Sequence, residues 1–374
     1  MNDRMRERKR FLLTAKENRR GKKIIYINET CRRLDGAVRE GGFSRNLAWE
    51  NWMRKHVADF QEIRLRKGKI LHHFQVFLNL LMRRNTTVFF LYPFLGVPVF
   101  YLNGADRLLS ACFFFCLKIC LKHNRVVFDI SDLKHEQAID LELVVKEHPR
   151  PYGEIEKKLF STEALFIFAS HRMRDYACEK YGIPAERTDV CVNGGNAVNR
   201  ETAVPLKPEQ DRINYVYAGT LNKGRQIEEL LEAFPEDENL HLYLMGTGGE
   251  WIHPDKKNIT CLGSLEEETA HRFVSLCDVG LIPYDETRLY YHLAYPTKLS
   301  FYLTAGIPFL STPVEEIRRA VEGMDGGWLA PVSEWEKRIR SLSREEIGGK
   351  RENVLRRQSA FFWGTILDRN RWIH

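Results

Sequence analysis

Two cationic side chains, Lys223 and Arg225, lie on a glycine-containing turn in the sequence YAGTLNKGRQIEELLEAF of residues 217–234. An arginine can hold a diphosphate through two parallel hydrogen bonds, and a lysine adds a point charge. Solvated surface cations are the alternative interpretation of this pair. Because the turn contains no GxGxxG pattern, a dinucleotide-binding fingerprint is not indicated. The chemistry that these two residues favour is the binding of a pyrophosphate group.

A second anion site is predicted in the segment YPTKLSFYLTAGIP of residues 295–308, where Pro296 is suited to open a helix. The backbone amides of Thr297, Lys298 and Leu299 would then lack partners within the helix. Such a helix start attracts anions, and the Lys298 ammonium adds a full positive charge. An ordinary capped helix between two strands is the alternative interpretation.

A third segment, MGTGGE at residues 245–250, follows an apolar run and contains Gly246 and Gly248. Glycines at the end of a strand let a ligand approach the backbone closely, although they also simply form turns. By itself this segment is a weak indication of a binding site.

The cysteines do not suggest a metal centre. None of the eight forms a CxxC pair, and Cys112, Cys116 and Cys120 recur at every fourth residue. This spacing places them on one helix face and predicts buried thiols in a reducing, cytoplasmic compartment rather than zinc ligands. The pair Asp129 and Asp132 is better explained by the end of a strand than by metal binding. We therefore expect no metal.

The elements that position these segments alternate along the first half of the chain. Strands are predicted at Lys23–Asn28, Thr87–Tyr92, Arg125–Ile130, Ala164–Ala169 and Asp189–Val192. Helices are predicted at Ser44–His56, Leu71–Arg83, Ala105–Lys122 and Arg172–Tyr181. Apolar strands that alternate with helices are typical of a parallel sheet covered on both faces. The apolar run of residues 108–121 is short and contains Lys118, which favours a buried helix over a membrane span.

The alternation restarts after a polar, turn-rich stretch at residues 194–211, which is typical of a linker. Strands are predicted at Ile213–Ala218, Leu240–Met245, Ile259–Leu262, Val279–Pro283 and Pro308–Ser311. Helices are predicted at Gln226–Phe234, Glu266–Ser275 and Thr297–Ala305. Two α/β halves joined by a linker create a cleft, and ligands of such sheets bind at the carboxyl ends of the strands.

In their order and spacing these segments resemble the donor domain of the GT-B glycosyltransferases, in the large retaining bacterial family. The matching parts are Gly219 and Leu221 before the Lys/Arg pair, LLEAF, the GTG of residues 246–248, Cys261–Gly263, Cys277–Tyr284 (CDVGLIPY) and Pro296–Pro308. In the first half, Gly41–Gly42, Arg125–Leu133 (RVVFDISDL) and the stretch from Ala164 to Asn193-Gly194 are similar to the family's pattern. The resemblance covers roughly residues 22 to 330 and is loose over the first hundred.

The resemblance implies an α/β fold with two Rossmann-like, doubly wound domains that face a cleft. It divides the chain into a basic amino-terminal segment (1–21), an acceptor domain (22–195), a linker (196–211), a nucleotide-sugar donor domain (212–345) and a helical tail (346–374) that returns to the first domain. Two departures from the family concern the donor site. Ser131 stands where the family often has a histidine, and Leu293 and Phe301 replace a pair of glutamates, of which the second binds ribose hydroxyls.

The implied activity is transfer of a hexose or galactofuranose from a nucleotide sugar, expected to be UDP-linked, to a glycan, lipid-linked or glycoprotein acceptor in bacterial surface polysaccharide synthesis. The branch it resembles includes transferases of adhesin and surface-polysaccharide pathways. The reaction is expected to retain anomeric configuration and to need no metal or cofactor. The expected catalytic residues are Lys223, Arg225 and Asp132. The expected donor-binding residues are Gly42, Gly219, Thr220, Lys223, Arg225, Gly246, Thr247, Gly263, Tyr284, Tyr295, Thr297, Lys298 and Leu299.

Ser131, Asp132 and Glu136 are the candidates for contact with the sugar or the acceptor, although Asp132 and Glu136 can equally be loop caps. Because the glutamate pair is missing, a non-catalytic subunit that partners another glycosyltransferase is the alternative function. A GT-B epimerase is disfavoured, since no matching His/Glu constellation is present.

The formal net charge of +7 is unevenly distributed, with a dense cationic cluster in residues 1–23 and a second one in residues 64–69. Such clusters attract polyanions, and a solvated surface is the alternative. Motifs for nucleic-acid binding are not found. We therefore expect a cytoplasmic protein that can lie at the inner face of an anionic membrane.

Overall fold

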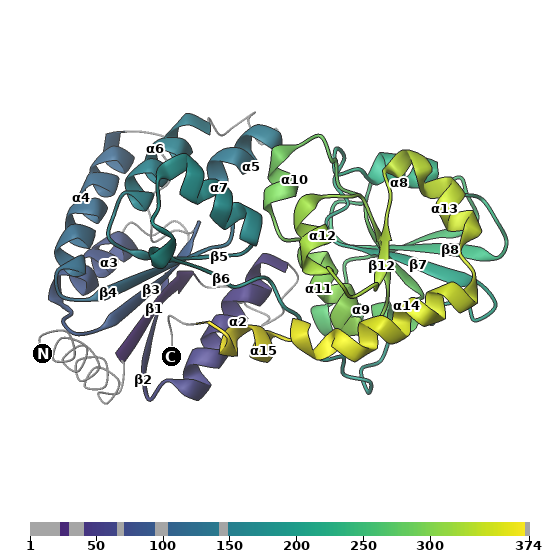
Figure 1. Cartoon of the computed structure of the whole chain (residues 1–374), viewed down its shortest axis with the longest axis horizontal. Coiled ribbons are helices and arrows are strands. Elements are labelled where there is room, and N and C mark those ends of the chain that lie inside the picture. The colour runs from purple at the N-terminus through teal and green to yellow at the C-terminus, as the bar shows by residue number, and fades with distance from the viewer. Residues whose placement is uncertain (1–22, 30–40, 66–70, 94–103, 142–148, 371–374) are drawn as a thin grey trace, which may run out of the picture.

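The computed structural model describes residues 23–29, 41–65, 71–93, 104–141 and 149–370. The basic segment of residues 1–21 and the final residues 371–374 lie outside the described residues. The chain forms two parallel six-stranded sheets that lie side by side along the long axis of the molecule (Figure 1). This confirms the prediction of two α/β halves.

The first sheet has the strand order β2-β1-β3-β4-β5-β6. Its strands are β1 (Lys23–Glu29), β2 (Asp59–Leu65), β3 (Thr87–Tyr92), β4 (Arg125–Ile130), β5 (Leu165–Phe168) and β6 (Thr188–Val190). The apolar runs predicted the central strands because those strands are covered on both faces; every residue of β3, for example, is buried. The edge strand β2 was not predicted, since polar side chains interrupt it and, among its side chains with described burial, Ile63 alone is buried.

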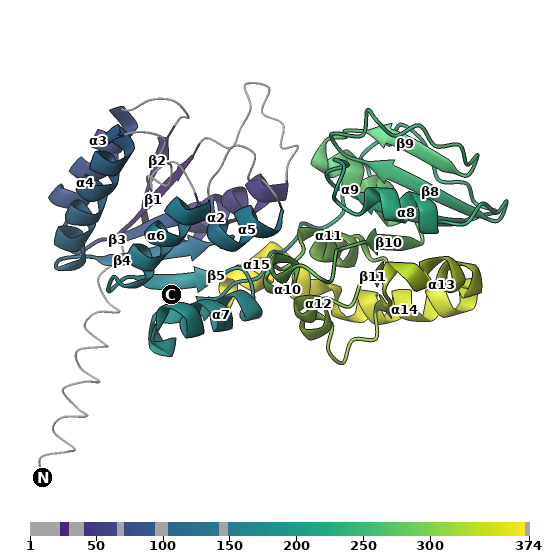
Figure 2. The same ribbon diagram turned by 90° about the horizontal axis from the view of Figure 1, so that it is seen from above.

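Helices cover both faces of the first sheet (Figures 1 and 2). They are α2 (Gly41–His56), α3 (Leu71–Met82), α4 (Gly104–Leu121), α5 (Lys134–Asp140), α6 (Pro149–Phe160) and α7 (His171–Tyr181). One face packs on a core that includes Val76 of α3 and Leu117 of α4. The other packs on Trp49 of α2 and Trp363 near the carboxyl end of the chain. Helix α2 starts at Gly41, so Gly42 lies in its first turn and not in a turn before Ser44 as predicted.

A buried ion pair fastens α2 to the first sheet. Arg45 donates two hydrogen bonds to Asp129 at the end of β4, with distances of 2.7 Å from Nε and 2.5 Å from Nη2. The indole of Trp49 donates a third, of 3.0 Å, to the same carboxylate. Arg45 also donates to Asn193, at the start of the segment that leads to the second half. Both ions are almost completely buried, so the pair depends on these hydrogen bonds for its solvation.

The second sheet has the order β12-β11-β10-β7-β8-β9. Its strands are β7 (Ile213–Ala218), β8 (Leu240–Met245), β9 (Ile259–Gly263), β10 (Val279–Ile282), β11 (Phe309–Ser311) and β12 (Gly327–Leu329). The helices between them are α8 (Ile227–Ala233), α9 (Glu267–Leu276), α10 (Leu289–Leu293), α11 (Thr297–Ala305) and α12 (Glu315–Ala320). The sequence predicted this half closely except for α10, α12 and β12, which are short and lack a clear periodicity.

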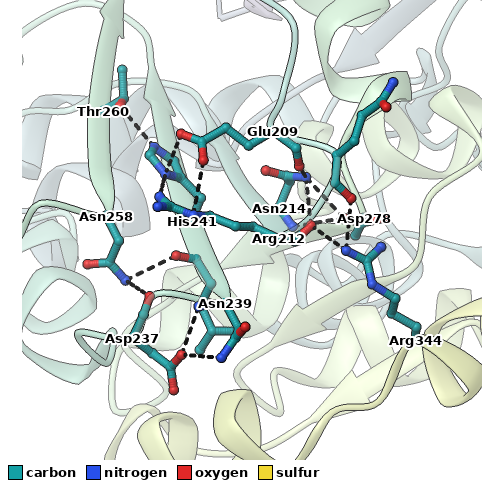
Figure 3. Close-up of polar contacts among 12 residues, drawn as sticks. Glu209, Arg212, Asn214, Asp237, Asn239, His241, Asn258, Thr260, Asp278 and Arg344 are labelled. Atoms are coloured by element: carbon teal, nitrogen blue, oxygen red, sulfur yellow. Dashed lines mark hydrogen bonds and ion pairs between the residues drawn. The ribbon is translucent and has the colours of Figure 1, made fainter.

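The amino ends of these strands are tied together by a polar network (Figure 3). The side chain of Asn214 donates to the backbone carbonyls of Glu209 and Arg212, at 2.7 and 3.0 Å. Arg344 of the carboxyl-terminal helix α14 donates to the carbonyl of Arg212, at 3.0 Å, and Asp278 accepts from the amide of Asn214, at 2.8 Å. These contacts hold the amino end of β7 to the segment before β10 and to α14.

The end of the chain crosses back to the first half. Helices α13 (Trp335–Ser341) and α14 (Arg344–Arg357) pack on the second sheet, and α15 (Trp363–Asp368) packs against α2. At the crossing, Gly195 and Phe362 form a parallel bridge, so the two connections between the halves run side by side. Trp52 of α2 donates a 2.7 Å hydrogen bond to Asp368. The sequence-based division at residue 346 falls inside α14. Across the described ranges, every helix is too short or too polar to cross a bilayer.

Candidate functional site

A cleft of about 720 Å³ opens at the carboxyl ends of the second sheet, where the two halves of the molecule meet. Residues of both halves line it: Ser44, Gln137, Gly194, Gly195, Ala218, Gly219, Thr220, Asn222, Arg225, Met245, Gly246, Thr247, Ser264, Leu265, Glu267, Ala270, Thr297, Lys298, Phe301 and Trp363. Seven of the predicted donor-binding residues therefore meet in one place: Gly219, Thr220, Arg225, Gly246, Thr247, Thr297 and Lys298.

Two glycines at the ends of β7 and β8 form the floor of this cleft. The φ angles of Gly219 and Gly246 are 155° and 149°. A Cβ atom on Gly246 would lie 1.7 Å from the carbonyl oxygen of Gly219, and one on Gly219 would lie 2.5 Å from Cε of Lys298. Only glycine fits at position 246, because the contact there is with backbone. Gly263 ends β9 and accepts a 2.9 Å hydrogen bond from the amide of Gly246, just outside the lining.

Lys298 holds its ammonium inside the cleft. Its Nζ lies 5.0 Å from the ring centre of Tyr217 and 5.4 Å from that of Tyr284, so two aromatic faces stabilise the cation. Burial and the positive charge of Arg225 lower the pKa of Lys298 to about 8. A bound anion would reverse this effect by favouring the charged amine. Tyr284 does not line the cleft itself. Its ring stacks on that of Tyr291, with 4.4 Å between the ring centres, and also contacts the Lys298 ammonium.

Helix α11 begins after Pro296, as predicted, and its amino end faces the cleft through Thr297 and Lys298. The prediction was wrong for Leu299, because its amide donates a 3.0 Å hydrogen bond to the carbonyl of Pro296 and its side chain is fully buried. Tyr295 is also part of the core, where its hydroxyl shares a 2.7 Å hydrogen bond with Ser300. Two amides, those of residues 297 and 298, thus remain as candidates for an anion.

The two cations of the turn after β7 separate in the structure. Arg225 lines the cleft, where it is partly exposed. Lys223 is exposed and does not line the cleft; its Nζ lies 5.3 Å from the ring centre of Trp251. Of the predicted pair Lys223 and Arg225, only Arg225 lines the cleft, and Lys298 is the second cation in the lining. The reason is local: Gly224 and Gln226 adopt left-handed conformations, with φ of 74° and 62°, so the turn directs successive side chains apart.

Comparisons with known proteins agree with this arrangement. Residues 212–345 match a family model described as glycosyl transferases group 1. No curated protein matches the chain in sequence. Among solved structures, Anabaena HepE in complex with UDP-glucose aligns over 92% of this chain and 97% of its own, with 12% identity and a TM-score of 0.59.

WaaG, a glycosyltransferase involved in lipopolysaccharide biosynthesis, covers 92% of this chain and 98% of its own at 12% identity, with a TM-score of 0.58. Sucrose-phosphate synthase from Thermosynechococcus elongatus covers 92% of this chain and 96% of its own at 14% identity, with a TM-score of 0.63. The chain has the GT-B fold. In this GT-B chain, the described cleft lies between the two Rossmann-like halves. The match to the glycosyl transferases group 1 model lies in the second half.

The first half of the GT-B fold does not place its predicted residues in the cleft. Ser131 donates a 3.0 Å hydrogen bond from its hydroxyl to the carbonyl of Tyr92. Asp132 accepts a hydrogen bond from the hydroxyl of Tyr290, which belongs to α10 of the second half. Burial raises the pKa of Asp132, against the opposing influence of that hydrogen bond and of nearby cations. Asp132 therefore joins the two halves in this conformation.

Glu136 is 3% exposed and is held within the first half. Its carboxylate accepts hydrogen bonds from Lys180 and, at 3.0 Å, from Tyr176. The prediction that Glu136 contacts sugar or acceptor is not supported by this position, and the alternative of a structural carboxylate fits better. Its neighbour Gln137 lines the cleft instead and donates a 2.8 Å hydrogen bond to Tyr290.

Several lining residues were missed by the sequence analysis. Gln137 and Ser44 come from the first half, and Trp363 comes from the returning carboxyl-terminal helix, far from any motif. The sequence could have indicated Glu267, because this residue follows the short strand β9 at the same sheet edge as Gly246. Phe301, noted only as a departure, also lines the cleft. Within the described ranges, no group of three or more His, Cys, Asp or Glu side chains is arranged to hold a metal ion.

Proposed function

We propose that this protein is a glycosyltransferase that transfers a hexose or galactofuranose from a UDP-linked sugar to a glycan, lipid-linked or glycoprotein acceptor in bacterial surface polysaccharide synthesis. The observation that carries the proposal is the convergence of Arg225, Lys298 and the start of α11 on one cleft at the strand ends. The second half then binds the donor, and the first half binds the acceptor. UDP and UDP-glucose in the HepE structures and the lipopolysaccharide role of WaaG support this choice of substrates.

The proposed chemistry follows from the charges in the cleft. When the bond between the sugar and the diphosphate breaks, negative charge develops on the diphosphate oxygens. Arg225, Lys298 and the amides at the start of α11 can stabilise that charge from fixed positions, and fixed dipoles need little reorganisation. Retention of anomeric configuration is part of the proposal and rests on the family resemblance; the anomer of the first product, read by NMR, tests it.

Arg225→Ala is expected to weaken UDP binding by about 1.5–3 kcal/mol, because it removes a charge-assisted hydrogen bond. Calorimetric titration of UDP measures this change. Lys223→Ala is the matched control: it removes a cation from the same turn but outside the cleft, so UDP affinity should hardly change. Equal losses for both variants, or no loss for Arg225→Ala, would contradict the placement of the diphosphate.

We also propose that transfer needs no metal, since the cations Arg225 and Lys298 supply the positive charge that a metal would otherwise bring. The isolated protein is expected to release UDP slowly from its donor by transfer to water. This release should continue in excess EDTA. Complete loss of turnover in EDTA, restored by Mg²⁺ or Mn²⁺, would overturn the proposal.

The second candidate function, a non-catalytic partner of another glycosyltransferase, is favoured by the apolar residues Leu293 and Phe301 at the positions of the family's glutamates. Leu293 is completely buried and cannot contact a ligand. If no nucleotide sugar binds or turns over, while the protein co-purifies with and activates another transferase, this function replaces the first one.

Cytoplasmic location with attachment to the inner face of an anionic membrane is proposed from the charged segments and from an outer surface on α3 and α4. We call this surface the α3–α4 patch; it consists of Leu71, Phe74, Leu78, Met82, Leu108 and Phe115, each at least half exposed. Exposed cations stand beside it at Arg84, Lys118 and Lys122. A large exposed apolar area with a basic rim suits a headgroup layer.

Flotation with phosphatidylglycerol-containing vesicles is expected to show binding that weakens with salt, because each Lys or Arg near the surface contributes roughly 1 kcal/mol. Deletion of residues 1–20 should weaken it, and Phe74→Ser with Phe115→Ser should weaken it independently. Leu206→Ser, which changes an exposed leucine far along the chain, is the control. Equal binding to neutral vesicles, or none to either kind, would rule out this mode of attachment.

A further inference from the structure

The lining of the cleft carries charges of both signs. Arg225 and Lys298 supply positive charge beside the start of α11. Glu267, the first residue of α9, is the single carboxylate among the described residues that line the cleft. A carboxylate repels phosphate and can only accept hydrogen bonds, so Glu267 suits a ligand group that donates them. The phosphates and the hydroxyls of one nucleotide therefore have different partners in this lining.

Glu267 is only loosely held by protein groups. Its Oε1 accepts from the hydroxyl of Ser44 across the cleft, at a long distance of 3.4 Å. That hydroxyl in turn accepts from the indole of Trp363, also at 3.4 Å. Hydroxyl hydrogen bonds are ordinarily near 2.7–2.8 Å, so these contacts are weak and a ligand can replace them. Burial raises the pKa of Glu267, and hydrogen bonds from Ser44 and Asn196 oppose that rise.

The second half also contributes apolar side chains to the lining of the cleft. Leu265, Ala270 and Phe301 line the same cleft, and the Phe301 ring lies 4.6 Å from that of His271. Such walls suit the flat face of a base or the carbon skeleton of a sugar, and they add no hydrogen-bonding group from their side chains. Among the described lining residues, the carboxylate of Glu267 is therefore the strongest acceptor for the hydroxyls of a ligand.

We infer that Glu267 accepts hydrogen bonds from the ribose hydroxyls of the donor nucleotide and thereby fixes the direction in which the nucleotide enters the cleft. This inference rests on the proposed function, because it assumes a nucleoside diphosphate with its phosphates at Arg225 and Lys298. The binding energy comes from charge-assisted hydrogen bonds, which the long contact with Ser44 supplies only weakly.

Three probes separate the parts of this arrangement: UDP, 2′,3′-dideoxy-UDP and inorganic pyrophosphate. The wild-type protein should bind UDP about tenfold to a hundredfold more tightly than the dideoxy compound, because the dideoxy ribose has no hydroxyls to donate to Glu267. Glu267→Gln should reduce this ratio to about threefold or less and leave pyrophosphate affinity unchanged, because an uncharged amide discriminates less strongly. Glu268→Gln is the matched control: Glu268 is exposed, bonds to Asn199 and Thr202 at 2.6 Å, and does not line the cleft.

The possible outcomes separate the inference from the function on which it rests. Equal wild-type affinities for UDP and its dideoxy analogue would overturn the role of Glu267 and leave the glycosyltransferase proposal intact. The same holds if Glu267→Gln keeps the full wild-type ratio. Failure of the wild type to bind UDP would overturn both. Thermal unfolding of each variant without ligand verifies that a changed ratio reflects binding and not loss of structure.

Discussion

Arg45→Met is expected to lower the free energy of unfolding by about 3–5 kcal/mol, because it leaves the buried carboxylate of Asp129 without its counter-ion. Asp129 is completely buried, and Arg45 supplies two of the hydrogen bonds that it accepts. The indole of Trp49 would still donate a hydrogen bond to this carboxylate, but a neutral donor cannot replace a cation. Urea unfolding followed by tryptophan fluorescence measures the change.

Arg54→Met is the matched control, since it removes the same kind of side chain from the same helix. Arg54 pairs with Glu50 and Glu62, but its side chain is 50% exposed, so the expected loss is only about 0–1 kcal/mol. A loss for Arg45→Met no larger than that of the control would show that the buried pair does not hold α2 on the sheet.

The affinity for UDP is expected to fall by up to about tenfold for each pH unit above about 8. Below that pH, Lys298 is charged both in the free protein and in the complex. Above it, free Lys298 loses its proton, since its pKa is lowered to about 8 by burial and by Arg225. The diphosphate raises this pKa in the complex, so binding must take up a proton and becomes weaker as the pH rises.

Calorimetric titrations in buffers of different ionisation enthalpy measure that proton uptake directly. The terminal phosphate of the ligand does not cause the change, because its second pKa is near 6 and it is already ionised in this range. Lys298→Met should bind UDP more weakly at neutral pH and with a much flatter dependence above it. An equally steep dependence in Lys298→Met would show that another group titrates.

The scaffold was largely predictable from sequence because its central strands are short, apolar and covered on both faces. β7 and β8 are found at the predicted residues, since apolar side chains fill both strands and turn-forming residues bound them. β2 was missed because charged residues interrupt its apolar pattern: Glu62 pairs with Arg64 of the same strand and with Arg54 of α2. Its place in the sheet depends on pairing with β1, which local sequence does not encode.

The candidate site was predictable where it is built from consecutive residues, as at Gly246, Thr297 and Lys298. The site was not predictable where it depends on the direction in which a side chain points. Lys223 and Arg225 are two positions apart, but only Arg225 lines the cleft. Nor could sequence indicate that Tyr290 covers Asp132, because that contact joins residues of different halves. Other departures have local causes: the turn geometry separates Lys223 from the cleft, and short-range hydrogen bonds hold Leu299 and Tyr295 in the core.

The returning helix α15 makes the first half of the molecule depend on residues that are synthesised after the second half. Trp363 and Leu367 complete one of its two cores, against Trp49 of α2. A ribosome that has finished Gly195 must still add the whole second half before those side chains exist. At about 5–20 residues per second this takes roughly ten to thirty seconds, during which the face of the nascent sheet beneath α15 stays open. The second half needs α14, which contributes Ile347 and Val354 to its cores, but it does not need α15. Its core can therefore close shortly before that of the first half, although it is translated later.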